Sequence, residues 1–147
     1  MSELLIRDFR PNDVEALCRL TIELGYPTTA DEMKQRMNCI LQNPDYKTIL
    51  ATSQTEVLGY IGMFKCLFWE QNGCYIKVQS LVVSSSARRQ GIGETLLEEA
   101  EKWGRAIGAK LITLNSGNRA ERFAAHQFYP AQGYEAKSTG YVKLIDP

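Results

Sequence analysis

The sequence predicts a mixed α/β (α+β) domain in which a central, mostly antiparallel sheet is flanked by helices. Two segments with helical periodicity follow a short first strand, and β-rich runs joined by turn residues come next. Beyond Val83 a strand, a glycine-containing loop, a helix and another strand follow one another, which is the order of a βαβ unit. The 147 residues fit a single domain over residues 1–147, because compact domains cluster near ~100 to 150 residues.

The amino-acid composition is that of a globular protein with a buried core. Hydrophobic residues make up 44% of the chain and charged residues 23%. Lys plus Arg and Asp plus Glu both total 17, so no net charge draws the protein onto nucleic acid or an anionic membrane. The apolar stretches are broken within about ten residues, whereas a membrane span needs roughly twenty, and the N-terminus lacks a signal peptide's basic start. We therefore expect a cytoplasmic protein without nucleic-acid or membrane partners.

The four cysteines give no sign of a metal site. They are Cys18, Cys39, Cys66 and Cys74, they show no Cys-x-x-Cys spacing, and His126 is the only histidine in the chain. Disulfides are rare in a reducing compartment. We expect no metal, and we interpret the cysteines as small buried hydrophobic residues.

Capping and turn residues define the expected elements of the first half. Asn12 and Thr29 each stand three residues before a glutamate, which is the spacing of a capping box, and apolar residues then recur at helical intervals. Asn72-Gly73 is a strong hairpin signal. The predicted elements are a strand over 4–6, a helix from Asn12 to Gly25, a helix from Thr29 to Asn43, and antiparallel strands over 47–52, 57–68 and 74–83.

The second half is expected to alternate helices and strands. Its first helix has an apolar stripe that runs from Ile92 to Ile107, and Gly108 should end it. A strand over 110–114 and a helix over 119–132 follow. The residues from Tyr134 onward, with 141–145, should close the sheet.

The segment from Ser84 to Glu94 has the features of an anion-binding loop. It joins a strand to a helix N-terminus, where backbone N–H groups lack intrahelical partners and the helix dipole adds positive charge. Gly91 and Gly93 carry no side chain to block a phosphate, and Arg88 and Arg89 add positive charge. The alternative interpretation is a tight turn with a solvated basic rim. The spacing matches neither a Walker loop nor a dinucleotide-binding fingerprint.

Two motifs resemble those of a known family. The run Leu81-Val82-Val83 followed by Arg88-Arg89-Gln90-Gly91-Ile92-Gly93 is similar to the strand and R-x-x-G-x-G loop of the GNAT acetyltransferases. The later run Ala125-His126-Gln127-Phe128-Tyr129 with Gly133-Tyr134 resembles the family's A-H-x-F-Y-x-x-x-G-F/Y signature. The resemblance covers nearly the whole chain, and a weaker likeness is to the aminoalkylphosphonate N-acetyltransferases.

The resemblance implies the GNAT fold, with a sheet of six to seven strands whose fourth and fifth strands splay apart as a cofactor groove. It implies that the loop holds the pyrophosphate of acetyl-CoA and that the pantetheine arm bonds the backbone near Leu81 and Val83. The implied acetyl-CoA contacts are Leu81, Val82, Val83, Arg88, Arg89, Gln90, Gly91, Ile92, Gly93, Glu94, Asn115, Ala125, Phe128 and Tyr129. Homodimers are common among relatives, so a homodimer is one expectation.

Acetyl transfer from a thioester needs a neutral amine and a proton for the departing thiolate. The resemblance gives the role of proton donor to Tyr129, since a phenol of pKa ~10 can protonate a thiolate without being ionised itself. The general base stays open, because the fourth strand carries Gln79 and Ser80 where many relatives have a glutamate. Either Gln79 or Ser80 orients a water that relays the proton, or Glu70 or Glu23 reaches the site from elsewhere.

Pro130 directly follows Tyr129 and puts the position of its hydroxyl in question. A proline removes a helical N–H bond, so we expect a distorted last turn that Gly133 caps. His126 stands three residues before Tyr129, and we expect it to cap the helix or to be partly exposed rather than to act in the chemistry.

The sequence thus predicts an N-acetyltransferase that moves an acetyl group from acetyl-CoA to a primary amine of a small molecule, by direct attack in a ternary complex. One alternative is a non-catalytic acetyl-CoA-binding sensor, which the lack of a carboxylate on the fourth strand favours. The other is a small α/β interaction module with no cofactor. Tyr26, Phe68 and Trp69 either line a substrate pocket or are core or dimer-contact aromatics.

Overall fold

The computed structural model describes residues 3–115 and 123–145. The chain divides into two compact units, Met1–Leu114 and Asn115–Pro147, and each is described by itself. The first unit contains β1 (Leu4–Asp8), the 3₁₀ turn η1 (Pro11–Asp13), α1 (Val14–Leu24), α2 (Ala30–Leu41), β2 (Tyr46–Ser53), β3 (Glu56–Leu67), β4 (Cys74–Val83), the 3₁₀ turn η2 (Ser85–Ala87), α3 (Ile92–Ile107) and β5 (Ala109–Leu114). The second unit contains α4 (Phe123–Ala131). In the described ranges no helix is both long enough and apolar enough to cross a membrane.

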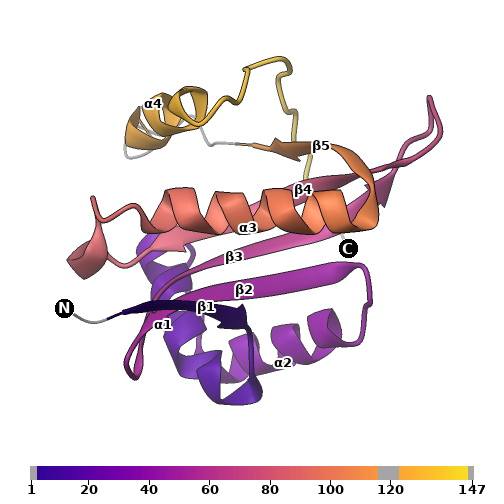
Figure 1. Cartoon of the computed structure of the whole chain (residues 1–147). Helices are drawn as coiled ribbons and strands as arrows, with labels where there is room; N and C mark the ends of the chain where they lie inside the picture. The colour runs from indigo at the N-terminus through magenta and orange to yellow at the C-terminus, as the bar shows by residue number, and fades with distance from the viewer. Residues whose placement is uncertain (1–2, 116–122, 146–147) are drawn as a thin grey trace. The chain divides into compact units, whose positions relative to one another are not determined.

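One five-stranded sheet forms the centre of the first unit, in the order β1-β2-β3-β4-β5. The first four strands pair antiparallel, and β5 runs parallel to β4 because α3 carries the chain back across the sheet. α3 covers one face, while α1 and α2 pack on the opposite face (Figure 1). The mixed, mostly antiparallel sheet with flanking helices is therefore confirmed.

Successive residues of β3 point to opposite faces of the sheet. Tyr60 belongs, with Val82 of β4, to the hydrophobic cluster that α1 and α2 cover. The preceding residue, Gly59, faces α3, because a Cβ built there would lie 3.4 Å from the Ile92 side chain. This alternation assigns the residues of β4 to the two faces as well, through their pairing with β3.

The expected capping is confirmed at α2 and wrong at α1. The Thr29 hydroxyl accepts a hydrogen bond from the Glu32 N–H at 3.1 Å, and the Glu32 carboxylate accepts one from the Thr29 N–H at 3.0 Å. At the start of α1, Asn12 lies inside η1. Asp13 occupies the N-cap position of α1 but its side chain makes no capping bond to that helix. Its buried carboxylate accepts from the Arg10 N–H at 2.8 Å instead, at the start of η1.

The expected burial of the cysteines holds for Cys18 and Cys74 only. Cys39 is exposed and Cys66 is half-buried, and all four are free thiols. Cys39 stands two residues after the buried Met37 on α2, which turns its side chain away from the sheet. Hydrophobic character alone does not decide which face of a helix a small residue occupies.

The described residues contain five strands, not the six to seven that the sequence predicts. Residues 134–145 have no regular secondary structure where closing strands are expected. The side chains of Tyr141, Val142, Leu144 and Ile145 are at least 85% exposed. Their β-favouring composition does not suffice, because a strand needs a neighbour that pairs with its backbone.

Pro130 lies within the last turn of α4, and Gly133 ends that helix as expected. Gly133 has a φ of 90° and its N–H donates to the carbonyl of Pro130 at 3.0 Å. The N–H of Tyr134 donates to the carbonyl of Tyr129 at 3.1 Å, which completes a Schellman motif. Of the predicted helix over 119–132, residues 119–122 lie outside the described residues.

Candidate functional site

The loop between β4 and α3 presents the N-terminus of α3 to solvent. Arg88, Arg89, Gln90 and Gly91 are all exposed. Arg89 and Gly91 have left-handed backbone conformations, with φ of 64° and 77°. A Cβ built on Gly91 would meet no other atom within 4 Å, so the space in front of it is open. Glycine is thus suited to this position both by its backbone and by the access it leaves.

The first turn of α3 offers backbone donors to a ligand. The carbonyl of Gly91 accepts from the N–H and the hydroxyl of Thr95, at 3.0 and 2.9 Å, which closes the first bond of the helix. Among the described residues, no acceptor pairs with the N–H groups of Ile92, Gly93 and Glu94. The positive end of the helix dipole lies at the same place. This turn can therefore hold an anion such as a phosphate.

Glu23 of α1 holds the start of this loop. Its carboxylate accepts a hydrogen bond from the Ser85 N–H at 3.0 Å. This bond, together with the positive charges of Arg19 and Arg88, lowers the pKa of the Glu23 carboxyl below its ordinary value. Glu23 thus anchors the start of the loop, and its alternative role as general base stays a prediction.

β4 is paired on both sides in its first half and on one side in its second half. β5 pairs with β4 between Cys74 and Val78. Ser80 to Val83 pair with β3 and have no β5 partner in the part of the chain that the structure describes. Gln79 lies between the two halves as the extra residue of a β-bulge. An open backbone edge therefore runs over residues 79–83.

The backbone groups of Leu81 and Val83 face this open edge. The N–H of Ser84 donates to the carbonyl of Leu58 on β3 at 2.7 Å. Because the N–H and C=O groups of successive strand residues point to opposite sides, those of Val82 also face β3. The groups of Leu81 and Val83 then point away from β3. These are the two residues near which the family resemblance implies bonds to pantetheine.

Ser80 belongs to a row of hydroxyl groups on the α1 face of the sheet. Its hydroxyl donates to the Tyr60 hydroxyl at 3.0 Å, and the Tyr60 oxygen lies 2.7 Å from the Thr21 hydroxyl. Tyr60 and Thr21 are buried, Ser80 is half-buried and Gln79 is exposed. Tyr60 and Thr21 are not among the residues that the sequence predicts, since each stands at an ordinary strand or helix position and no motif marks it.

Phe128 and Tyr129 are half-buried neighbours at the end of α4 in the second unit. Their ring centroids lie 5.3 Å apart in an edge-to-face arrangement, and the Tyr129 ring contacts the Tyr134 ring at 6.1 Å. The helical position expected for Tyr129 is thus present in spite of Pro130. Its role as proton donor stays a prediction.

The other C-terminal candidates also lie in the second unit. Asn115 is exposed, and its side-chain nitrogen lies 3.7 Å from the position of a Cβ on Gly140. Ala125 and His126 belong to α4, and their side chains lie outside the described part of the structure. Acetyl-CoA contacts by Asn115 and Ala125 therefore stay predictions.

Glu70 lies at the wrong end of β4 for a general base. It belongs to the loop between β3 and β4, which is at the opposite end of the strand from the β4–α3 loop (Figure 1). From Cys74 to Ser80 the strand rises about 20 Å. Glu70 is thus separated from Gln79 and Ser80 by most of the strand.

The three aromatic candidates for a pocket have different surroundings. Trp69 is 102% exposed and Tyr26 is 54% exposed, so neither is a core residue. Phe68 is half-buried and packs against Tyr75, with ring centroids 4.7 Å apart. Trp69 and Phe68 share the loop of Glu70 and lie far from the open edge.

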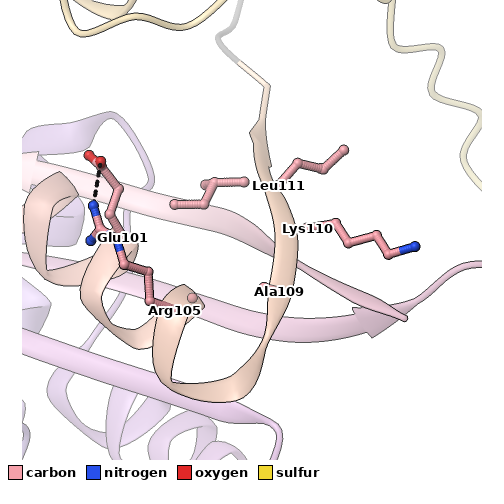
Figure 2. A pocket seen from close by; sticks show the side chains of 7 residues that line it. Glu101, Arg105, Ala109, Lys110 and Leu111 are labelled. Atoms are coloured by element: carbon pink, nitrogen blue, oxygen red, sulfur yellow. Dashed lines mark ion pairs between the residues drawn. The ribbon is translucent and has the colours of Figure 1, made fainter. Parts of the chain in front are cut away.

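A hollow of about 210 Å³ lies between the end of α3 and β5 (Figure 2). It is lined by Glu101, Gly104, Arg105 and residues 109–112, and Figure 2 shows Glu101 turned toward Arg105, its ion-pair partner at 3.8 Å. The hollow is at the C-terminal end of α3, and a helix of this length separates its ends by about 24 Å. None of the predicted site residues lines it.

Known proteins resemble this chain in sequence and in fold. The model of the acetyltransferase (GNAT) family matches residues 13–134. The aminoalkylphosphonate N-acetyltransferase of Salmonella typhimurium (strain LT2) is 31% identical over 105 residues, which cover 71% of this chain and 67% of that protein.

Solved structures of acetyltransferases have the same fold. A GNAT family acetyltransferase of Staphylococcus aureus is 33% identical with a TM-score of 0.83, over 99% of this chain and 100% of that chain. The aminoglycoside N-acetyltransferase AAC(6')-Iy, solved in complex with CoA, has a TM-score of 0.85 at 16% identity, over 99% of this chain and 96% of that chain. The first match supports the family, and the second supports the fold alone.

The family match spans most of the chain and contains the loop, the open edge of β4 and the α4 motif. Its members transfer acyl groups, which favours the enzyme over a non-catalytic sensor or an interaction module. The chain belongs to the GNAT acetyltransferase family and is an acetyl-CoA-dependent acyltransferase.

Proposed function

We propose that this protein transfers the acetyl group of acetyl-CoA to the primary amine of a small molecule, by direct attack within a ternary complex. The observation that carries the proposal is the open edge of β4 over residues 79–83, from which a short loop leads to the N-terminus of α3. An extended pantetheine arm can add to such an edge as a strand does. The diphosphate can then bind the N–H groups of the first helical turn.

The α1 face of the sheet is the side on which the amine is expected. Ser80 points to this face because its hydroxyl bonds to Tyr60, whereas Leu81 and Val83 are half-buried on the α3 face. The half-buried Ser80 and the exposed Gln79 both stand on the open half of β4. These polar side chains can meet an amine at the edge that binds the thioester arm.

The reaction requires two proton movements. An alkyl ammonium of pKa ~10 must lose one proton before its nitrogen attacks the thioester carbon, and a water oriented by Gln79 or Ser80 accepts that proton. The C–N bond then forms and the C–S bond breaks. Tyr129 gives its phenolic proton to the departing thiolate and regains one from the product nitrogen, so the amide and free CoA leave with all atoms accounted for.

Aminoalkylphosphonates are the first acceptor class to test. The Salmonella relative is named for them and is 31% identical to this chain.

We also infer a single domain over residues 1–147, which is supported by a family match that includes parts of both compact units. A cytoplasmic location and a homodimer stay predictions.

A spectrophotometric thiol-release assay tests the proposal. The acceptors are aminoalkylphosphonates, polyamines, aminoglycosides, amino acids and peptides, with Gly91→Glu as the inactive control. We expect turnover with a small primary amine, and initial rates that give intersecting lines when both substrates are varied. Parallel lines would show a covalent acetyl-enzyme and contradict direct attack, and turnover with peptides alone would contradict the small-molecule acceptor.

A further inference from the structure

The hydroxyl groups of Thr21, Tyr60 and Ser80 connect α1, β3 and β4 next to the open edge. The two oxygen–oxygen distances are 2.7 and 3.0 Å, and Tyr60 and Thr21 are only 6% and 7% exposed. Burying a hydroxyl costs free energy unless it is hydrogen-bonded, and a phenylalanine would fill the same space without that cost. A buried tyrosine that bonds to a residue of the site therefore calls for a functional explanation.

The direction of the bonds decides what Ser80 offers to a substrate. Each hydroxyl has one proton to donate and two lone pairs that accept. Ser80 donates its proton to Tyr60, which lies in the core. The side of the Ser80 oxygen that faces away from Tyr60 then carries lone pairs only.

This arrangement complements an amine. A primary ammonium group carries three donors and no acceptor, so it binds to oxygen lone pairs. β4 provides no carboxylate at this place, since its open half begins with Gln79 and Ser80. A serine oxygen whose proton is directed inward provides such lone pairs, beside the amide oxygen of the exposed Gln79.

We propose that Tyr60, supported by Thr21, is a positioning residue that directs the Ser80 proton into the core and makes the Ser80 oxygen a hydrogen-bond acceptor for the incoming amine. The inference rests on the proposed function, because it names the group that the amine meets. It assigns to α1 a part in orienting the reacting group, through the contact between Thr21 and Tyr60.

The test is a double-mutant cycle of Tyr60→Phe and Ser80→Ala. Each single change should lower kcat/KM for the amine about tenfold, the effect of one lost hydrogen bond, and the double variant should be no worse than either single variant. The affinity for CoA, measured by calorimetry, should not change. Tyr46→Phe is the matched control, since it removes a phenolic hydroxyl from β2, and its kcat/KM should equal that of the wild type.

A second pair of variants keeps the test valid if Tyr60→Phe does not fold. Thr21→Val removes the hydroxyl but preserves the shape, and should lower kcat/KM about threefold, whereas Thr21→Ser should restore it. A purely structural role for the hydroxyl row predicts a different result. Thermal melting would then fall in each variant while kcat and KM for the amine stay at wild-type values.

The cycle is run with whichever acceptor the thiol-release assay identifies. An acceptor that is a peptide contradicts the small-molecule proposal, but the cycle still tests Tyr60. Multiplicative effects of Tyr60→Phe and Ser80→Ala, or an unchanged kcat/KM in Tyr60→Phe, would overturn the positioning role.

Discussion

The two halves of β4 have similar side chains and different surroundings. Both halves contain buried apolar residues, but Cys74 to Val78 pair with strands on both sides, whereas Ser80 to Val83 pair with β3 alone in the described chain. A bulge at Gln79 separates the two halves. The cofactor binding that we propose for β4 therefore depends on where the pairing of the strand ends, and not only on its side chains.

The largest effect is expected where the open half leads into α3. Gly91→Glu places a carboxylate in the open space before the helix, so the affinity for acetyl-CoA should fall roughly a hundredfold or more through repulsion of the diphosphate. Gly108→Glu is the matched control, because Gly108 has a similar φ of 72° at the other end of α3. Calorimetry measures both variants. Equal loss in the two would mean that backbone strain, not the anion site, is responsible.

The chemical step should depend on the second unit. Tyr129→Phe removes the expected proton donor, so the transfer rate should fall about a hundredfold at pH 7 while calorimetry finds unchanged CoA affinity. Tyr141→Phe serves as the control, since Tyr141 is 92% exposed. A wild-type rate for Tyr129→Phe across the pH range would remove Tyr129 from the chemistry.

Two proline variants compare the paired and open sides of β4 directly. Val83→Pro deletes an N–H that faces the open edge, and should weaken acetyl-CoA binding about tenfold with the fold retained. Val82→Pro deletes an N–H that faces β3 and leaves a carbonyl of β3 without its partner, and should cost about 1–3 kcal/mol of stability. Urea unfolding and calorimetry distinguish the two effects. Similar destabilisation by both prolines would show that the open edge is in fact paired.

The smallest effect concerns the anchor of the loop. Glu23→Ala removes the acceptor of the Ser85 N–H, and should lower acetyl-CoA affinity about fivefold by loosening the loop. Glu23→Gln keeps an acceptor oxygen and should remain within about twofold of the wild type. If Glu23→Gln loses turnover while its affinity for acetyl-CoA is unchanged, Glu23 would instead be identified as the general base.

Much of the fold follows from local sequence signals. The capping box of Thr29 and Glu32, the glycines after α1 and α3, and the strand over 74–83 are all present as predicted. Each of these depends on residues within a few positions along the chain. Asn12, Cys39 and the closing strands over 134–145 are wrong, because a cap, a helix face and a strand pairing depend on neighbours that a local pattern does not contain.

The candidate site divides in the same way. The anion loop from Arg88 to Gly93 is a contiguous motif, so it could be found without coordinates. Glu23 and Ser85 are separated by 62 positions, and Tyr60 and Thr21 by 39, so their contacts have no sequence signature. For the same reason the sequence left Glu23 and Glu70 as candidate bases, whereas the fold shows that Glu23 holds the β4–α3 loop and that Glu70 lies in the β3–β4 loop.

By itself the sequence determined the family, the βαβ unit and the glycine loop at the start of α3, because these features follow from adjacent residues and their spacing. Only the tertiary structure decided that the pairing of β5 with β4 ends at Val78, and that Leu81 and Val83 turn their backbone groups to the open side. It also decided that the Tyr60 oxygen accepts a hydrogen bond from the Ser80 hydroxyl. The physical reason is that an open edge and a buried hydrogen bond depend on which strands and helices pack together, and packing joins residues that lie far apart in the chain.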